Sequence, residues 1–114
     1  MLLESDPAHR DLLRLVLERE NYSVVCTGDP VRAELLLRRN RFDYVVLEML
    51  LPGMNGLKLI RRVREDRSLC QPHFIVMSSL SFREVVQQVA ELKVAGFLKK
   101  PVAPEELLAR LSSI

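Results

Sequence analysis

A glutamate at the end of an apolar segment is the first residue in this sequence that could do chemistry. Residues 44–47 are apolar or β-branched and lead directly into Glu48, and a Pro-Gly step and an Asn-Gly step follow. Such a run, bounded by turn residues, is typical of a strand buried on both faces of a parallel sheet. A carboxylate at the end of a buried strand is costly unless it is solvated, paired or metal-bound. Glu48 is therefore the first candidate functional residue.

Other polar side chains stand at the ends of the remaining apolar segments. Glu4 and Ser5 follow the first segment, Ser78 ends the fourth, and Lys100 follows the fifth. In an open doubly wound sheet, ligands bind beyond the carboxyl ends of the strands, where the strand order reverses. If the first and third strands are neighbours there, two carboxylates, hydroxyls and one ammonium share a single crevice.

The elements that must position these residues form a regular alternation of five strands and five helices. The expected strands are residues 1–3, 23–27, 44–48, 74–78 and 96–98. Asp6 and Asp29 each precede a proline, which predicts a helix that begins with an N-cap and a proline in its first turn. The most regular helical pattern has its apolar residues at Phe82, Val85, Val86, Val89 and Ala90. This alternation predicts βαβ units and a parallel sheet covered by helices on both faces.

The size and charge of the chain exclude several classes of protein. The 114 residues carry 17 basic and 15 acidic side chains, a net charge of +2, which argues against direct nucleic-acid binding. We expect a single domain over residues 1–114. No apolar run approaches the roughly 20 residues that span a bilayer, and no signal peptide is evident. Cys26 and Cys70 form no disulfide framework, so we expect a cytoplasmic protein without membrane contact. His9 and His73 are isolated from any ligand cluster, and a metal site built on them is not expected.

Four stretches of the chain together resemble the receiver domain of response regulators, the phosphoacceptor module of two-component signalling. They are Glu4-Ser5-Asp6-Pro7, residues 44–56, residues 75–79, and the Phe-Leu-Lys-Lys-Pro run at residues 97–101. The resemblance covers nearly the whole chain. It implies an α/β, flavodoxin-like, doubly wound fold in which five helices cover a five-stranded parallel sheet with strand order 2-1-3-4-5.

The resemblance also implies a magnesium site and a phosphoacceptor. In the family, an acidic pair after the first strand and an aspartate that ends the third strand hold the metal, and that aspartate accepts the phosphoryl group. Here Glu4 and Ser5 stand at the acidic-pair positions and Glu48 at the acceptor position, and Leu50 would offer its backbone carbonyl to the metal.

Three further positions carry family roles by resemblance. Ser78 and Lys100 stand where side chains contact the phosphoryl oxygens, and Phe97 stands at the position of the aromatic switch. Each has a simpler interpretation from its chemistry. Ser78 can cap the following segment, and Phe97 has no hydroxyl and can simply pack in the core. Lys93 stands where the family usually has a glycine before the fifth strand.

Two departures from the family fall on the chemistry itself. Ser5 offers a neutral hydroxyl where magnesium needs a carboxylate, and the extra methylene of Glu48 moves its carboxyl group about 1.5 Å further into the crevice. In-line phosphoryl transfer depends on positioning and on neutralisation of charge by the metal. We therefore expect no catalytic residue and no resident cofactor, and at most a weak magnesium site at Glu4, Glu48 and Leu50.

Two hypotheses for Glu48 follow from its length. In one, Glu48 pairs with Lys100 and acts as a built-in mimic of the phosphoryl group. In the other, the pair is a plain salt bridge left from a lost site, without a role in signalling. The sequence does not choose between them.

The preferred interpretation is a degenerate receiver, not an enzyme, that signals by protein contact without phosphorylation. Its expected contact surface is the fourth helix, fifth strand and fifth helix, which would bind a protein partner or a second copy; a histidine kinase is a further candidate partner. The alternative is a receiver that is weakly phosphorylated in a magnesium-dependent reaction. A nucleotide-binding flavodoxin-like domain is not supported, because Glu4-Ser5-Asp6-Pro7 contains no glycine-rich phosphate loop.

Overall fold

The computed structural model describes residues 1–80 and 82–114, and it leaves out the side chains of residues 82, 84 and 86. The predicted inward positions at Phe82 and Val86 therefore lie outside the described side chains. Within the described part of the chain, no helix is both long enough and apolar enough to cross a membrane.

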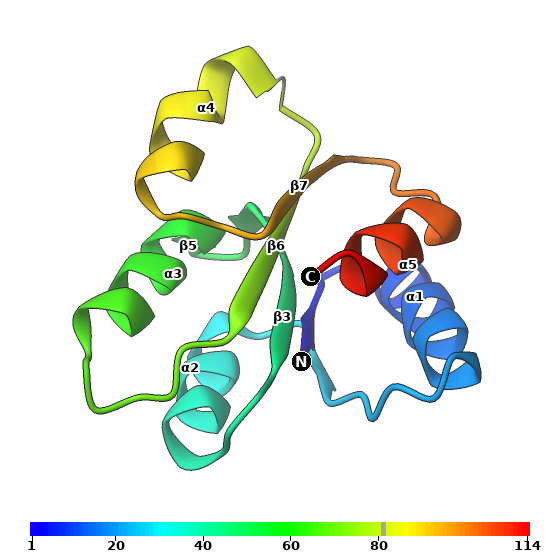
Figure 1. Cartoon of the computed structure of the whole chain (residues 1–114), viewed down its shortest axis with the longest axis horizontal. Coiled ribbons are helices and arrows are strands. Elements are labelled where there is room, and N and C mark those ends of the chain that lie inside the picture. Colours follow the sequence, from blue (N-terminus) through cyan, green and yellow to red (C-terminus); the bar gives the residue numbers. More distant parts are fainter. Residues whose placement is uncertain (81) are drawn as a thin grey trace.

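Five parallel strands form the central sheet, which confirms the predicted fold class (Figure 1). They are β1 (Leu2–Leu3), β2 (Cys26–Thr27), β3 (Tyr44–Glu48), β6 (His73–Ser78) and β7 (Gly96–Lys99). Their order, β2-β1-β3-β6-β7, is the predicted order 2-1-3-4-5. In the register of β1 and β3, Leu3 lies opposite Leu47. The residues that follow, Glu4 after β1 and Glu48 at the end of β3, therefore lie side by side.

Five helices cover the two faces of this sheet. They are α1 (Pro7–Arg19), α2 (Pro30–Arg39), α3 (Gly56–Glu65), α4 (Phe82–Glu91) and α5 (Pro104–Ser112). Helices α1 and α5 lie on one face, and α2, α3 and α4 lie on the other (Figure 1). An apolar cluster lies between the sheet and the helices on each face. Leu13 of α1 and Leu107 of α5 pack in one cluster, and Ile60 of α3 and Val85 of α4 pack in the other.

The helix starts follow from their sequences. The side chain of Asp6 accepts a hydrogen bond from Ala8 N, and that of Asp29 accepts one from Val31 N, so both predicted N-caps are confirmed. Asn55 caps α3 in the same way through Leu57 N. These caps satisfy free N–H groups of the first turn, and the cap at Asp6 lets α1 begin at Pro7, three residues after Glu4.

Several local predictions were wrong. The second strand pairs only over Cys26–Thr27, not over residues 23–27. The turn after β3 contains an unpredicted antiparallel pair, β4 (Leu50–Leu51) and β5 (Met54–Asn55). Ala90, which belongs to the apolar pattern of α4, is exposed, whereas Val89 is buried. In each case the pairing of a short strand or the exposure of a single side chain depends on neighbours in space and not on the local sequence.

Candidate functional site

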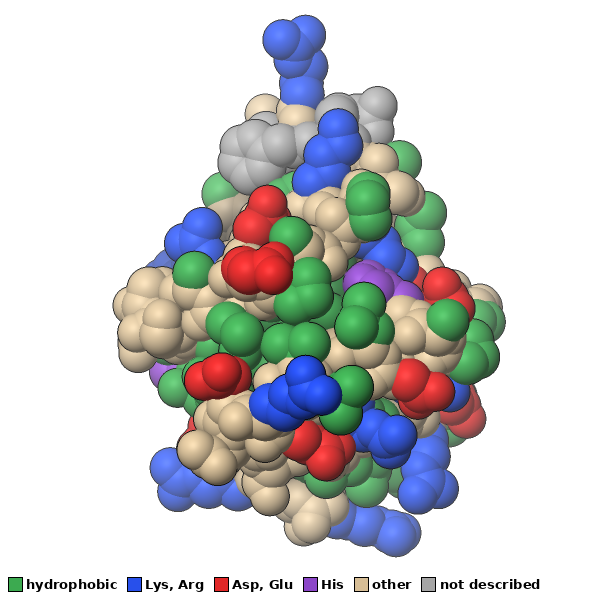
Figure 2. Space-filling view, turned by 90° about the vertical axis from the view of Figure 1, so that its right-hand side faces the viewer, with side chains coloured by type: hydrophobic (Ala, Val, Ile, Leu, Met, Phe, Trp, Pro, Cys, Tyr) green, Lys and Arg blue, Asp and Glu red, His purple; other side chains and the backbone are tan. Residues whose placement is uncertain are grey.

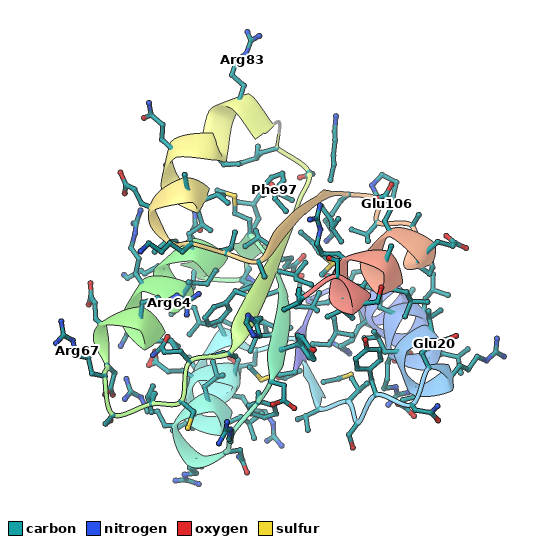
Figure 3. The ribbon with its side chains drawn as sticks, viewed as in Figure 1. Glu20, Arg64, Arg67, Arg83, Phe97 and Glu106 are labelled. Atoms are coloured by element: carbon teal, nitrogen blue, oxygen red, sulfur yellow. The ribbon has the colours of Figure 1, made fainter. Side chains whose placement is uncertain are left out.

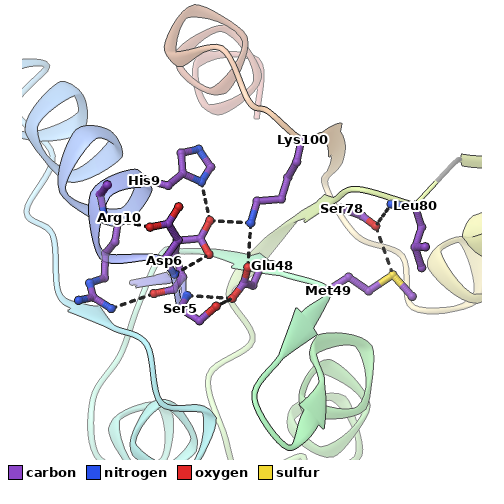
Figure 4. A network of polar contacts seen from close by, with 11 residues as sticks. Ser5, Asp6, His9, Arg10, Glu48, Met49, Ser78, Leu80 and Lys100 are labelled. Atoms are coloured by element: carbon purple, nitrogen blue, oxygen red, sulfur yellow. Dashed lines mark hydrogen bonds and ion pairs between the residues drawn. The ribbon is translucent and has the colours of Figure 1, made fainter.

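The site lies at the carboxyl end of the sheet, where three strand ends bring acidic and basic side chains together (Figure 4). Glu4 follows β1, Glu48 ends β3, and Lys100 follows β7. Glu4 is fully buried and Glu48 is only 5% exposed. Gly56 at the start of α3 lets this helix approach β3 closely, because a Cβ there would clash with the backbone oxygen of Glu48.

Lys100 bridges the two carboxylates. Its Nζ lies 2.8 Å from Glu4 Oε1 and 2.8 Å from Glu48 Oε2. A single ammonium therefore compensates two buried acids that come from neighbouring strands. Pairing of this kind is what makes buried carboxylates tolerable.

Ser5 binds the other oxygen of Glu48. Its backbone N–H donates to Glu48 Oε1 over 2.8 Å, and its hydroxyl donates to the same oxygen. With Lys100 on Oε2, both carboxylate oxygens of Glu48 already hold hydrogen bonds. Ser5 thus contributes to the site as a donor to Glu48, a role opposite to that of an anionic metal ligand.

His9 joins the site, which corrects the prediction that this histidine is isolated from any cluster. Its Nδ1 contacts Glu4 Oε1, and the backbone N–H of Asp6 donates to Glu4 Oε2 over 3.3 Å. Arg10 lies nearby, but its Nη1 donates to the backbone oxygen of Glu4 and not to the carboxylate. The sequence signal for His9 is its place in the first turn of a helix that begins three residues after Glu4.

The network shifts the ionisation of its members. Burial on its own raises the pKa of Glu48, but hydrogen bonding with Glu4, Lys100 and Ser5 outweighs burial and lowers that pKa to about 2. For Lys100, burial lowers the pKa, whereas the bonds to Glu4 and Glu48 raise it above its ordinary value. The structure therefore stabilises an ionised Glu48 and a charged Lys100.

Ser78 does not turn toward the acids. Its hydroxyl accepts a hydrogen bond from Leu80 N over 3.0 Å and lies 3.7 Å from Met49 Sδ (Figure 4). This geometry is that of a side chain that caps the turn after β6. A phosphoryl contact through Ser78 stays a prediction.

The other two predicted positions lie at the edges of the site. Phe97 on β7 is half-buried and packs against the apolar cluster on the α3 and α4 side of the sheet, as Figure 3 shows. Leu50 on β4 is 55% exposed, beside the crevice. Their roles as aromatic switch and as backbone ligand also stay predictions.

The donor set does not fit a magnesium ion. Magnesium sites in proteins rest on carboxylate oxygens and water, yet here one expected carboxylate is Ser5, and Lys100 Nζ lies between the remaining two. Among the described residues, no three or more His, Cys, Asp and Glu side chains are arranged to hold a metal ion.

A doubly wound parallel sheet with an acidic crevice at its carboxyl ends defines the class as a flavodoxin-like α/β domain. A family model described as response regulator receiver domain matches residues 1–112. The chain therefore belongs to the receiver-domain family of response regulators, the signalling modules of two-component systems.

Known proteins agree with this assignment. The DNA-binding response regulator MtrA of Mycolicibacterium smegmatis is 31% identical over 111 residues, which cover 97% of this chain and 47% of that protein. The chain thus spans about half the length of the curated relatives it matches. Among solved structures, a response regulator receiver protein from Pseudomonas putida is similar with a TM-score of 0.88 and 25% identity, over 99% of this chain and 93% of that one. The chemotaxis response regulator CheY4 of Vibrio cholerae shares the fold, with a TM-score of 0.87 and 23% identity over 98% and 93% of the two chains.

Proposed function

We propose that residues 1–114 form a single receiver domain that signals by protein contact without phosphorylation of Glu48. The observation that carries this proposal is that both carboxylate oxygens of Glu48 are engaged, Oε1 by Ser5 and Oε2 by Lys100. A phosphoacceptor needs one oxygen free to approach phosphorus in line and a cation to neutralise the phosphoryl charge. In this site neither oxygen of Glu48 is free of donors, and Ser5 stands where the family has a carboxylate that helps to hold the cation. No enzymatic activity is part of this proposal.

The proposed contact surface is formed by α4, β7 and α5. Exposed charged side chains on it belong to α4 (Arg83 and Glu91), β7 (Lys99) and α5 (Glu105, Glu106 and Arg110). The side chain of Glu84 on α4 lies outside the described ones. Figure 3 shows Arg83 and Glu106 projecting from α4 and α5. Acidic, basic and apolar side chains are interspersed on the α1 and α5 side of the molecule (Figure 2). A mixed surface of this kind suits a protein partner or a second copy better than a nucleic acid.

A test of phosphorylation uses a small phosphoryl donor. The wild-type domain and the variant Ser5→Asp with Glu48→Asp are incubated with acetyl phosphate and Mg²⁺, and intact masses are recorded. The double variant restores the family's acidic pair and acceptor, so it should gain a phosphoryl group while the wild type does not. A phosphorylated wild type would instead support the alternative, a weakly phosphorylated magnesium-dependent receiver. An unmodified double variant would contradict the view that these two positions account for the loss.

The two hypotheses for the Glu48–Lys100 pair predict different effects at the contact surface. In the first the pair is a built-in phosphoryl mimic, and in the second it is a relic, a salt bridge left from a lost site. If Glu48 acts as a mimic, Glu48→Gln should move amide resonances of β7 and α5 as well as those around the crevice. If the pair is a relic, shifts should stay within residues that touch Glu48. A partner found by pull-down should then bind the two forms differently in the first case and equally in the second.

A further inference from the structure

The turn between α4 and β7 contains a residue in a conformation that favours glycine. Helix α4 ends at Glu91, and the N–H of Lys93 still donates to Ala90 O. Lys93 has a φ of +52°, the left-handed conformation that commonly ends a helix and usually belongs to glycine. Two residues later the N–H of Ala95 donates to Phe74 O, and the chain enters β7. The conformation of Lys93 therefore decides how α4 is joined to the sheet.

An arginine from a different helix binds this turn. Arg64, in the last turn of α3, donates from Nε to Leu92 O over 3.3 Å and from Nη2 to Lys93 O over 3.4 Å. Its Nη1 donates to Gln71 Oε1 over 3.1 Å, and its Cζ lies 5.0 Å from the centre of the Phe74 ring. The side chain lies on the side of α3 that faces the sheet (Figure 3). All three nitrogen atoms of the guanidinium thus have partners, and two of them hold the end of α4.

Charge and shape both suit an arginine at this place. The carbonyl end of a helix carries a partial negative charge, so a cation beside it is favourable, and basic side chains can bind the last carbonyls of a helix. A guanidinium presents several N–H groups in one plane, whereas an ammonium is a compact point charge. Stacking on an aromatic ring adds to the attraction. Arg64 therefore offsets part of the cost of the left-handed conformation at Lys93.

From these contacts we infer that Arg64 is a positioning residue of the proposed contact surface, because it holds the turn after α4 and so fixes α4 against β7. The inference rests on the proposed function, since α4 and β7 belong to that surface. Arg64 itself lies on α3, outside the surface. A substitution at this position should alter how α4 is presented to a partner without removing any side chain of the surface.

The experiment is amide hydrogen exchange of the 114-residue chain, followed by NMR, with no phosphoryl donor and no partner present. Arg64→Met removes the donors and keeps an apolar stem. The amides of Leu92, Lys93 and Ala95 should then exchange about tenfold faster, the change expected from the loss of a hydrogen bond to a charged group. The amide of Asn40, which donates to Leu36 O at the end of α2, should keep its wild-type rate. This pattern is that of local opening at one turn.

Three further variants make the test specific. Arg64→Lys keeps the charge without the planar fork, so it should accelerate the same amides, and it carries the test if Arg64→Met does not fold. Arg61→Met, at an exposed position of α3, is the matched control and should leave their exchange unchanged. Addition of Lys93→Gly to either Arg64 variant should slow the exchange by about threefold, because glycine adopts the left-handed conformation without strain.

Any one of five results would overturn the inference. They are unchanged exchange in the Arg64 variants, an equal acceleration at Asn40, wild-type behaviour of Arg64→Lys, an equal acceleration in Arg61→Met, and exchange that Lys93→Gly does not slow. No phosphoryl donor is used, so these outcomes are independent of the phosphorylation test. Phosphorylation of wild-type Glu48 would refute the proposed function, whereas a turn that is indifferent to Arg64 would refute only the positioning role.

Discussion

Replacing Glu48 with glutamine should destabilise the fold strongly at neutral pH and much less in acid. Glutamine keeps the shape of the side chain and an oxygen that can accept from Ser5, but it removes the negative charge that Lys100 binds. The variant therefore resembles the protonated form of Glu48. The difference in stability between the two proteins reports the free energy that ionised Glu48 contributes to folding.

The magnitude follows from the pKa. The pKa of Glu48 falls from its ordinary value of 4.5 to about 2 on folding. A shift of one pKa unit corresponds to about 1.4 kcal/mol. The ionised carboxylate thus contributes about 3 kcal/mol at pH 7. Because the folded-state pKa is depressed, this contribution is fully present above pH 4.5 and is lost as the pH falls toward 2. At pH 3 it should have declined to about 1 kcal/mol.

The assay is urea unfolding of wild type and Glu48→Gln at pH 7, 4 and 3, followed by circular dichroism. Glu65→Gln is the matched control, because Glu65 is an exposed carboxylate at the end of α3 and its loss should change stability by less than about 0.5 kcal/mol. A difference between wild type and Glu48→Gln that is constant from pH 7 to pH 3 would refute the reasoning. A difference that grows in acid would refute it as well.

Two further predictions concern backbone conformation and have opposite signs. Gly53 has a φ of +73°, and a Cβ added there would meet no atom within 4 Å. Gly53→Ala should therefore lower the stability by about 1 kcal/mol through the left-handed conformation alone. The urea midpoint should fall with an unchanged slope, and an unchanged midpoint would contradict this prediction. Lys93 has a φ of +52°, so Lys93→Gly should raise stability by about 0.5–1 kcal/mol, because relief of about 1–2 kcal/mol of strain exceeds the extra chain entropy of glycine. An unchanged or lower midpoint for Lys93→Gly would show that the lysine is not strained there.

The fold could be predicted from the sequence because the sequence signals are local and mutually consistent. Apolar runs of strand length alternate with helical patterns, and the Asp-Pro pairs at Asp6 and Asp29 mark where two helices begin. Each signal depends on a few neighbouring residues, so it can be recognised without knowledge of distant contacts. The errors lie where local signals are weak, as in the two-residue strand β2 and the small β4–β5 pair.

The residues of the site were also largely predictable, but the hydrogen bonds and ion pairs between them were not. The ends of the apolar segments identify Glu4, Glu48 and Lys100 as residues that a parallel sheet brings to one edge. The participation of His9 was missed, because it depends on the angle at which α1 leaves β1. The hydroxyl of Ser78 faces Leu80 and Met49, a direction set by the turn after β6.

The sequence by itself therefore determined the class of fold and that Glu4, Glu48 and Lys100 reach the crevice, since short local patterns mark the strand ends and helix starts. Only the tertiary structure decided that one ammonium bridges both acids and that Ser5 donates to Glu48. Those contacts join residues 43 to 96 positions apart in the chain. Their distances depend on strand register and helix packing, and no local pattern specifies them.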